Sequence, residues 1–224
     1  MNDKSTFTRY EFRYLIKIEQ KKELLKLINQ HMQKDDYVQS IYNLYFDTND
    51  YLLTRKNLAH PLYKEKIILR SYGKANINTK IFLEIKKSFN NFVYKHTFPI
   101  KERSLKHYIT KNNSLECLYP NIEPKMFIGY NRESYTSIDN PDFRINFDYN
   151  IVYRDNDLTL CGEMYGDRLI PKGIVLMEIK STNPLPLWIT NFLNQKCIFE
   201  TSFSKYSRAY QESNERKMLI TYSI

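Results

Sequence analysis

Alternation of hydrophobic and polar residues runs through much of the chain and predicts a fold built mainly of β-strands. In residues 81–87, Glu84 and Lys86 share one face, while isoleucine and leucine side chains form the other. Residues 176–180 repeat this Glu-x-Lys pattern from Glu178. A period of two residues is typical of a strand with one buried face. Two such strands indicate a sheet whose charged face has a function.

The same patterning predicts the other elements. Further strands are expected at residues 9–16, 40–46, 63–72, 92–100, 125–136, 142–149 and 174–180, with short ones at 151–154 and 158–161. Helices are expected at residues 19–32, about 50–55, 101–111, 184–193 and from 203 to 210. An antiparallel sheet of this size closes or splits to hide its edges. We therefore expect an α+β fold dominated by strands, a closed antiparallel β-barrel of about eight strands with flanking α-helices.

The charged faces of these strands turn toward one another if the apolar faces pack under helices. An ordinary small barrel fills its interior with apolar side chains, but this one would have a wet, basic lumen. The inward-facing candidates are Arg9, Arg13, Lys66, Arg70, Lys86, Lys95, Arg132, Arg144, Lys180 and Lys205. So many close cations need neutralisation. Glu11, Glu84 and Glu178 neutralise some of them, and a bound chain of phosphates is the simplest partner for the rest.

Composition narrows the class of protein. The chain has 224 residues, few glycines and no linker-like segment, which favours one domain over residues 1–224 with a core at about 7–212. A formal charge of +9 indicates a polyanionic partner. Three isolated cysteines, a polar N-terminus and the absence of a long apolar run favour a cytoplasmic protein without a membrane span.

The carboxylates on the charged faces suggest a metal. Glu178 and Glu84, on facing strands, are candidate ligands for Mg²⁺ or Mn²⁺, because hard divalent ions bind one or two carboxylates together with substrate phosphates. Metal and cations together suit phosphoryl transfer, which depends on positioning and charge stabilisation. No glycine-rich phosphate loop, G-x-S-x-G or H-E-x-x-H motif is present. Any one of these basic residues alone is most simply a solvated surface residue, so the inference depends on agreement among six strands.

Several motifs, in order, resemble a known family. They are residues 9–14 (Arg-Tyr-Glu-Phe-Arg-Tyr), 42–48 (Tyr-Asn-Leu-Tyr-Phe-Asp-Thr), 69–73 (Leu-Arg-Ser-Tyr-Gly), 82–86 (Phe-Leu-Glu-Ile-Lys), 130–132 (Tyr-Asn-Arg), 143–145 (Phe-Arg-Ile) with Asp148, 177–180 (Met-Glu-Ile-Lys) and 203–206 (Phe-Ser-Lys-Tyr). Taken together, from Arg9 to about Tyr210, they resemble the VTC (vacuolar transporter chaperone) domain. This is the polyphosphate polymerase branch of the CYTH-like triphosphate tunnel metalloenzymes.

The resemblance implies a basic tunnel in which the γ-phosphate of ATP is transferred to a growing polyphosphate chain with Mn²⁺ or Mg²⁺. It implies that Glu178 binds the metal. The implied catalytic residues are Arg70, Lys86, Arg132, Arg144 and Glu178, the first four gripping the nucleotide's phosphates. The implied substrate-binding residues are Arg9, Arg13, Lys66, Lys95, Tyr130, Lys180, Ser204 and Lys205, of which Arg13, Lys95 and Lys205 guide acceptor or product.

The sequence departs from the family pattern at three positions. Ile68 stands where the family usually has Arg, Ser202 where it often has a basic residue, and Arg13 where Lys is usual. The loss of two cations predicts weaker nucleotide binding or slower transfer. Lys66, on the same face as Ile68, or Lys64 is placed to compensate.

Three other functions remain open at this point. One is a triphosphate hydrolase of the same tunnel class, although strand one carries only Glu11 where such hydrolases carry two carboxylates. Another is a non-catalytic polyphosphate- or nucleotide-binding module, which Ile68 and Ser202 support. Nucleic-acid binding ranks last, because the cations follow faces that turn inward, and we expect no nucleic-acid partner. Any coupling to a membrane would need a separate partner, since the membrane-spanning segments of the fungal family members are not found here.

Overall fold

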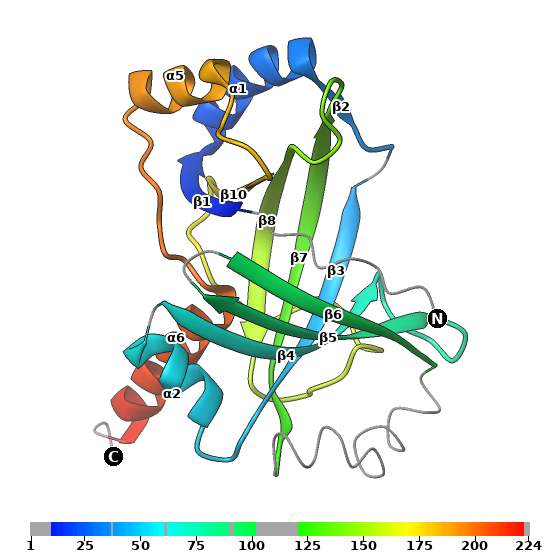
Figure 1. Ribbon diagram of the computed structural model, residues 1–224. Coiled ribbons are helices and arrows are strands. Elements are labelled where there is room, and N and C mark those ends of the chain that lie inside the picture. The colour runs from blue at the N-terminus through cyan, green and yellow to red at the C-terminus, as the bar shows by residue number, and fades with distance from the viewer. Residues whose placement is uncertain (1–9, 37, 61, 90–91, 102–120, 222–224) are drawn as a thin grey trace.

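One antiparallel sheet of ten strands organises the fold (Figure 1). The computed structural model describes residues 10–36, 38–60, 62–89, 92–101 and 121–221. Eight strands follow one another across the sheet in the order β1-β10-β8-β7-β3-β4-β5-β6, while β2 pairs with β7 and β9 with β8. The strands are β1 (Tyr10–Lys17), β2 (Met32–Lys34), β3 (Gln39–Asp47), β4 (Tyr63–Tyr72), β5 (Lys80–Phe89), β6 (Phe92–Lys101), β7 (Glu123–Ser137), β8 (Arg144–Arg154), β9 (Asp167–Arg168) and β10 (Ile174–Ser181).

The sheet is strongly curled, and β4, β5 and β6 cross in front of β3, β7 and β8 (Figure 1). The expected β-dominated antiparallel fold is therefore confirmed. Closure of the barrel is incomplete in the described residues, because β1 and β6 end the strand order without pairing to each other. Side chains bridge this side of the sheet instead, with Lys86 Nζ of β5 4.0 Å from Glu11 Oε2 of β1.

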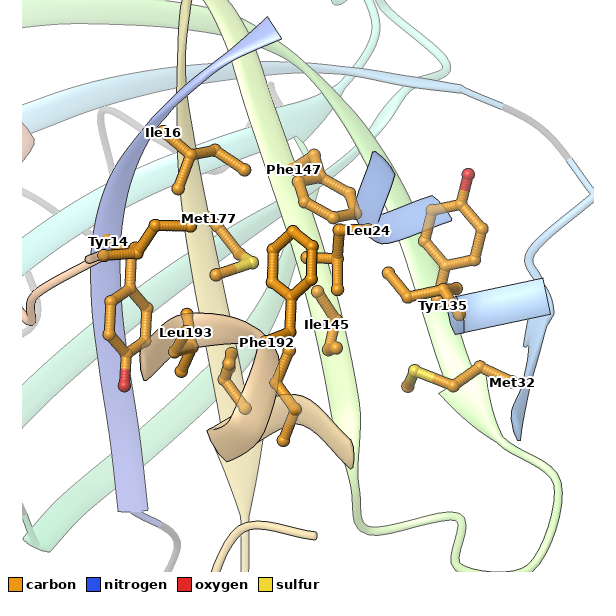
Figure 2. Close-up of a cluster of buried hydrophobic side chains, with 14 of the residues drawn as sticks. Tyr14, Ile16, Leu24, Met32, Tyr135, Ile145, Phe147, Met177, Phe192 and Leu193 are labelled. Atoms are coloured by element: carbon orange, nitrogen blue, oxygen red, sulfur yellow. The ribbon is translucent and has the colours of Figure 1, made fainter. Parts of the chain in front are cut away.

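Helices α1 (Ile18–His31) and α5 (Leu187–Gln195) cover the convex face of β1, β10, β8 and β7. Met177 of β10 points into this layer toward Leu24 of α1 and Phe192 of α5 (Figure 2). Ile179, the next alternate residue of β10, belongs to the same buried cluster. Leu24 and Ile28 lie one helical turn apart and are fully buried, which is why this segment forms an amphipathic helix. The neighbouring residues of β10 consequently point to the concave face.

Helix α6 (Lys205–Thr221) packs into the concave face. Its Tyr206 ring stacks on Tyr45 of β3, with ring centroids 4.8 Å apart, and Ala209 is fully buried in the same apolar cluster. The concave face is thus divided: one part is filled by apolar residues and α6, and the other is lined by charge. The expectation of a lumen that is wet throughout is corrected in this respect.

Asp47, the last residue of β3, links α6 to helix α2 (Leu52–Ala59). Its carboxylate is fully buried and accepts hydrogen bonds from the backbone N–H groups of Thr48, Leu53 and Thr54 at 2.8–3.0 Å. It also accepts one from the Tyr206 hydroxyl at 3.0 Å. The carboxylate therefore caps α2 and anchors the start of α6.

Most predicted elements are present, with differences at a few places. Residues 151–154 belong to β8, and residues 158–161 form no strand, because Leu160 packs its side chain into the core and accepts a hydrogen bond from Ala75 N–H at 2.9 Å. Helix α6 extends well beyond residue 210. Pairing of Phe89 with Phe92 confirms the hairpin expected there. The helix expected at 101–111 falls outside the described residues. In the part of the chain that the structure describes, no helix is long and apolar enough to cross a membrane.

Candidate functional site

A cavity of about 360 Å³ opens on the charged part of the concave face. Strands β1, β3, β4, β5, β6, β7 and β10 and the start of α6 contribute side chains to it. Eight of its lining residues are Lys or Arg and two are Glu, so the cavity is strongly cationic. The lining residues are Glu11, Arg13, Tyr45, Lys66, Ile68, Arg70, Lys86, Val93, Lys95, Tyr130, Arg132, Glu178, Lys180, Phe203, Ser204 and Lys205.

Arg132 and Lys205 are held by two carboxylates. Arg132 Nε and Nη2 donate to the two oxygens of Asp148 at 2.6 and 2.7 Å, and Nη2 also donates to Glu178 Oε2 at 2.8 Å. Lys205 Nζ lies 2.6 Å from Asp148 Oδ2 and donates to Glu178 Oε1 at 3.1 Å. Both cations also lie over the Tyr130 ring, at 5.3 and 4.7 Å from its centroid. This bidentate arrangement fixes both cations before any ligand binds.

Arg70 is fixed by a second set of partners behind the cavity wall. Its Nε donates to Asn43 Oδ1 at 2.8 Å, and Asn43 in turn donates to the backbone oxygen of Ile128 at 2.8 Å. Its Nη1 donates to Glu84 Oε1 at 3.2 Å, and Lys95 Nζ lies 2.6 Å from the same oxygen. Glu84 therefore binds two cations and leaves their outer faces to the cavity.

Glu11 is the carboxylate at the edge of the sheet. It accepts a hydrogen bond from Arg13 Nη2 at 2.8 Å and lies 3.9 Å from Lys180 Nζ and 4.0 Å from Lys86 Nζ. Arg13 also reaches Glu178, with Nε 3.7 Å from Oε1. One arginine thus connects the two carboxylates that line the cavity.

The carboxylates stay ionised in this environment. Burial alone would favour the protonated form, but Lys86 and Arg13 outweigh it and lower the pKa of Glu11 to about 2. In the same way, burial opposes ionisation of Glu178, yet Lys205 and Arg132 hold its pKa well below the usual range. Both groups are therefore available as permanently charged oxygen ligands.

Burial lowers the pKa of four lysines at the cavity, and the shift is largest for two of them. Burial, together with the charge of Arg132, lowers the pKa of Lys180 to about 8. Desolvation, followed by the charges of Arg13, Lys86 and Lys64, lowers the pKa of Lys66 well below its ordinary value. These amines are poorly neutralised, so a bound anion would stabilise their protonated forms.

Ser204 and Lys205 stand at the start of α6, where the helix meets the cavity. The Ser204 hydroxyl oxygen accepts from Ser207 N–H at 3.3 Å, as an N-cap does, and from Lys66 Nζ at 2.8 Å. The helix end carries partial positive charge and unpaired N–H groups. It adds to the positive potential that the side chains create.

Most predicted site residues come together here. Those that line the cavity are Arg13, Lys66, Arg70, Lys86, Lys95, Tyr130, Arg132, Glu178, Lys180, Ser204 and Lys205. Glu84, a predicted metal ligand, lies behind the wall and is 1% exposed. Arg144 does not line the cavity: it is exposed at the start of β8 and its Nε donates to the backbone oxygen of Pro141 at 3.2 Å. Arg9 lies outside the described residues.

Sequence reasoning did not assign the residues that position the cations. Asn43 and Asp148 are fully buried, yet they determine where Arg70, Arg132 and Lys205 lie. The available signal was polar side chains on strands at lumen-facing positions, such as Asp148 on the same face as Asn146. Which cation each would bind follows from pairing between strands far apart in sequence.

The donor set is compatible with a divalent ion. Among the residues that the structure describes, no three His, Cys, Asp or Glu side chains form a metal cluster. Glu178 and Glu11 nevertheless offer ionised oxygens inside the cavity, and Mg²⁺ typically takes only one or two carboxylates and completes its shell with phosphates and water. The residues present therefore fit an ion held jointly with a phosphate ligand. Of the two expected ligands, Glu178 lines the cavity and Glu84 lies behind its wall.

The structure therefore has a curled antiparallel sheet around a cationic cavity that two carboxylates line. The model of the VTC domain family matches residues 8–214, which is almost the whole chain. The chain therefore belongs to the VTC domain family, and the resemblance seen in the sequence is confirmed. The comparison with curated proteins returns no significant match.

Solved structures share the fold at low sequence identity. One is a Hippeastrum protein described as an adenylyl cyclase with a dominant triphosphatase activity; it is 13% identical, with a TM-score of 0.53 over 91% of this chain and 95% of that one. Another is a Pyrococcus horikoshii protein, 12% identical, with a TM-score of 0.52 over 91% and 99% of the two chains. These similarities establish the fold.

Proposed function

We propose that this protein is a metal-dependent polyphosphate polymerase, which transfers the γ-phosphate of ATP to a growing polyphosphate chain. The observation that supports this most is the cation-lined cavity with ionised Glu178 at its centre, held by Arg13, Arg132 and Lys205. Family membership supports the same activity. A cavity of this charge suits a substrate that is itself a chain of phosphates.

The cavity's own residues account for most of the chemistry. Arg70, Arg132 and Lys205 are rigidly held and would bind the nucleotide's phosphates, where negative charge develops during phosphoryl transfer. Positioning by fixed cations avoids reorganisation at the moment of reaction. The attacking oxygen belongs to an ionised phosphate, so no general base is needed.

Glu178, together with Glu11, would hold Mn²⁺ or Mg²⁺ at the substrate's phosphates. The bound ion supplies neutralisation of phosphate charge. Arg13, which contacts both carboxylates, keeps them directed into the cavity. Glu84 acts differently, because it fixes the position of Arg70 and Lys95 from behind.

Incubation with ATP and Mn²⁺, with products resolved by gel and phosphorus NMR, tests the proposal. We expect long polyphosphate and ADP from the wild type and from the control Lys74→Ala, whose exposed side chain lies outside the cavity. Glu178→Ala and Arg132→Ala should lose the polymer. A thermal shift with triphosphate but no turnover would indicate a binding module. The absence of both turnover and a thermal shift would refute the proposal entirely.

Triphosphate hydrolysis is a second candidate. It is favoured by Glu11, which adds a second carboxylate to the cavity and could orient water. A protein of similar fold is described as having triphosphatase activity. In the same assay, free phosphate without polymer would select this function.

A further inference from the structure

The main cavity continues into a smaller chamber at its outer end, which we call the mouth. The mouth has a volume of about 60 Å³. It shares Glu11, Arg13, Lys66, Lys86, Val93 and Ser204 with the main cavity and adds Leu62, Lys64 and Ser88. A continuous path therefore runs from the fixed cations around Glu178 to the ends of β4 and β5.

The balance of charge differs between the two parts. In the deep part, five cations are accompanied by three carboxylates. Arg70 and Lys95 share Glu84, and Arg132 and Lys205 share Asp148 and Glu178. The fifth cation, Lys180, lies 3.9 Å from Glu11. At the mouth, four cations face one carboxylate. They are Arg13, Lys64, Lys66 and Lys86, with Glu11. The mouth therefore lacks the negative charge needed to neutralise its cations.

Lys66 shows this lack of negative charge most clearly. Its Nζ donates to the neutral Ser204 hydroxyl at 2.8 Å, and among the described residues no carboxylate lies within ion-pair distance of it. The groups that face it are Arg13 and Glu11 from β1, Lys86 from β5 and Lys64 from its own strand, so three of four charges are repulsive. Its lowered pKa is the expected result of that surrounding. The start of α6 adds further positive potential at Ser204.

The apolar side chain of Ile68 separates the positive charge of Lys66, at the mouth, from that of Arg70 in the main cavity. Ile68 lies on the same strand face as Lys66 and Arg70 and is nearly fully buried, so the wall is apolar at the point between them. Lys66 is two residues away, which places its Cα about 6.6 Å further toward the mouth. Lys66 therefore presents its ammonium group nearer the mouth than a basic residue at position 68 would.

We infer that the mouth is a separate phosphate subsite, formed by Lys64, Lys66, Lys86 and Ser204, that holds the end phosphate of the acceptor chain. This inference rests on the proposed polymerase function. The size of the chamber agrees, because 60 Å³ holds roughly four to six water-sized groups, enough for a phosphate and too little for a nucleoside. The nucleotide then has only the larger cavity to occupy.

Calorimetric titration with inorganic tripolyphosphate tests the subsite without requiring turnover. The wild type should bind the chain tightly, because the phosphates supply the negative charge that the mouth lacks. Lys66→Met should bind about 10- to 100-fold more weakly. Lys66→Arg should keep the affinity, since the guanidinium group retains the positive charge.

Lys74→Met, with an exposed side chain outside both chambers, is the matched control and should behave as the wild type. Equal affinity in the wild type and Lys66→Met would overturn the subsite. Orthophosphate titrated alone distinguishes the ligand: if it binds as tightly as tripolyphosphate, with the same dependence on Lys66, the mouth is a site for free phosphate and not for a chain end.

The role of acceptor is tested by primed synthesis. Lys64→Met, at a residue that lines the mouth and not the main cavity, should raise the KM for a tripolyphosphate primer and leave the KM for ATP unchanged. A raised KM for ATP alone would overturn the acceptor assignment. Lys66-dependent binding of tripolyphosphate by a protein that makes no polymer would refute the proposed function and leave the phosphate site standing.

Discussion

Asp148 holds two of the cavity's cations at once, because its oxygens contact Arg132 and Lys205 at 2.6–2.7 Å. It is fully buried and does not line the cavity. Its function is therefore to position and partly neutralise residues that do. The geometry makes the protein's stability and its ligand affinity depend on the same carboxylate.

Asp148→Asn should lower the free energy of unfolding by about 3–5 kcal/mol, because two buried cations lose their shared counter-charge. Thermal denaturation measures this change, with the exposed Asp139→Asn as control. Tripolyphosphate should restore part of the loss, since it supplies the missing negative charge. Equal melting temperatures for Asp148→Asn and Asp139→Asn would show that Asp148 is dispensable.

Lys180 should set the alkaline limit of activity, since its pKa is lowered to about 8. Above that pH the amine is neutral and no longer attracts phosphate, so kcat/KM for ATP should fall as pH rises through about 8. In Lys180→Arg the guanidinium stays protonated and the fall should move to higher pH. Superimposable pH profiles for the two proteins would contradict this assignment.

Arg132 and Arg144 should differ sharply when each is replaced by alanine. Arg132 lines the cavity and contacts Asp148 and Glu178, so its loss should lower kcat by about 10²-fold or more. Arg144 is exposed and bonds Pro141, so its loss should change kcat little. A comparable loss in both variants would mean that Arg144 moves into the cavity with substrate bound, as the family resemblance implies.

At the level of residues, alternation along the strands and the family resemblance together predicted eleven lining side chains. A period of two assigns each strand residue to a face, whereas Tyr130 and Ser204 came from the resemblance. Alternation did not separate Arg144 from the others, since a face does not tell how far along the strand the cavity extends. It also could not show that Glu84 lies behind Arg70, because burial depends on the neighbouring strand.

Among the elements, the junction of β3, α2 and α6 has the largest effect on the site. Asp47 accepts bonds from the first turn of α2 and from Tyr206, the residue next to Lys205. Tyr206 also stacks on Tyr45, whose ring lines the cavity. The position of Lys205 therefore depends on the hydrogen bond that its neighbour Tyr206 donates to Asp47.

Tyr206→Phe tests this hydrogen bond, because it keeps the ring and removes the hydroxyl that Asp47 binds. Loss of a hydrogen bond to a charged group should cost about 1.5–3 kcal/mol, which lowers the melting temperature by about 3–12 °C. Tyr210→Phe, on the same helix and in ring contact with Tyr51, is the control and should have little effect. A stable Tyr206→Phe protein would show that ring stacking alone holds α6.

Strands were easier to predict than the last helix. Strand β4, Tyr63–Tyr72, has the predicted bounds, because residues of its two faces alternate along the segment. The second half of α6 is rich in polar residues and shows no apolar stripe, so nothing in the sequence marked its length. Residues 158–161 alternate like a strand, but they pack as an irregular segment whose carbonyl oxygen at Thr159 accepts from the Arg154 guanidinium.

On the scale of the whole molecule, the concave face has an apolar part that α6 covers and a cationic part. The Lys and Arg side chains of the cationic part repel one another. The free protein therefore keeps unfavourable charge at its centre, and a polyanion should relieve it. Sequence patterning indicated the two faces of each strand, but it could not show this division. Only the strand order, which brings β1 and β10 beside β8, places apolar and charged segments in one concavity.

Tripolyphosphate should therefore stabilise the protein strongly. At a concentration about 100 times Kd, binding adds about 2.7 kcal/mol, which corresponds to a rise in melting temperature of about 5–11 °C. The shift should shrink as salt is added, and duplex DNA, which is too wide for a cavity of about 360 Å³, should produce little shift. A larger shift with DNA than with tripolyphosphate would favour binding on an outer surface.

The order in which the cavity's residues occur along the chain determines when the cavity can form during synthesis. Arg13 is made near the beginning of synthesis and Lys205 near the end, while Asp148 and Glu178 come between them. A growing chain on the ribosome therefore contains both carboxylates before the lysine that joins them exists. The cavity is complete only when the final helix emerges, so a protein released early, before residue 204, would have the strands of the sheet without the complete cationic cavity.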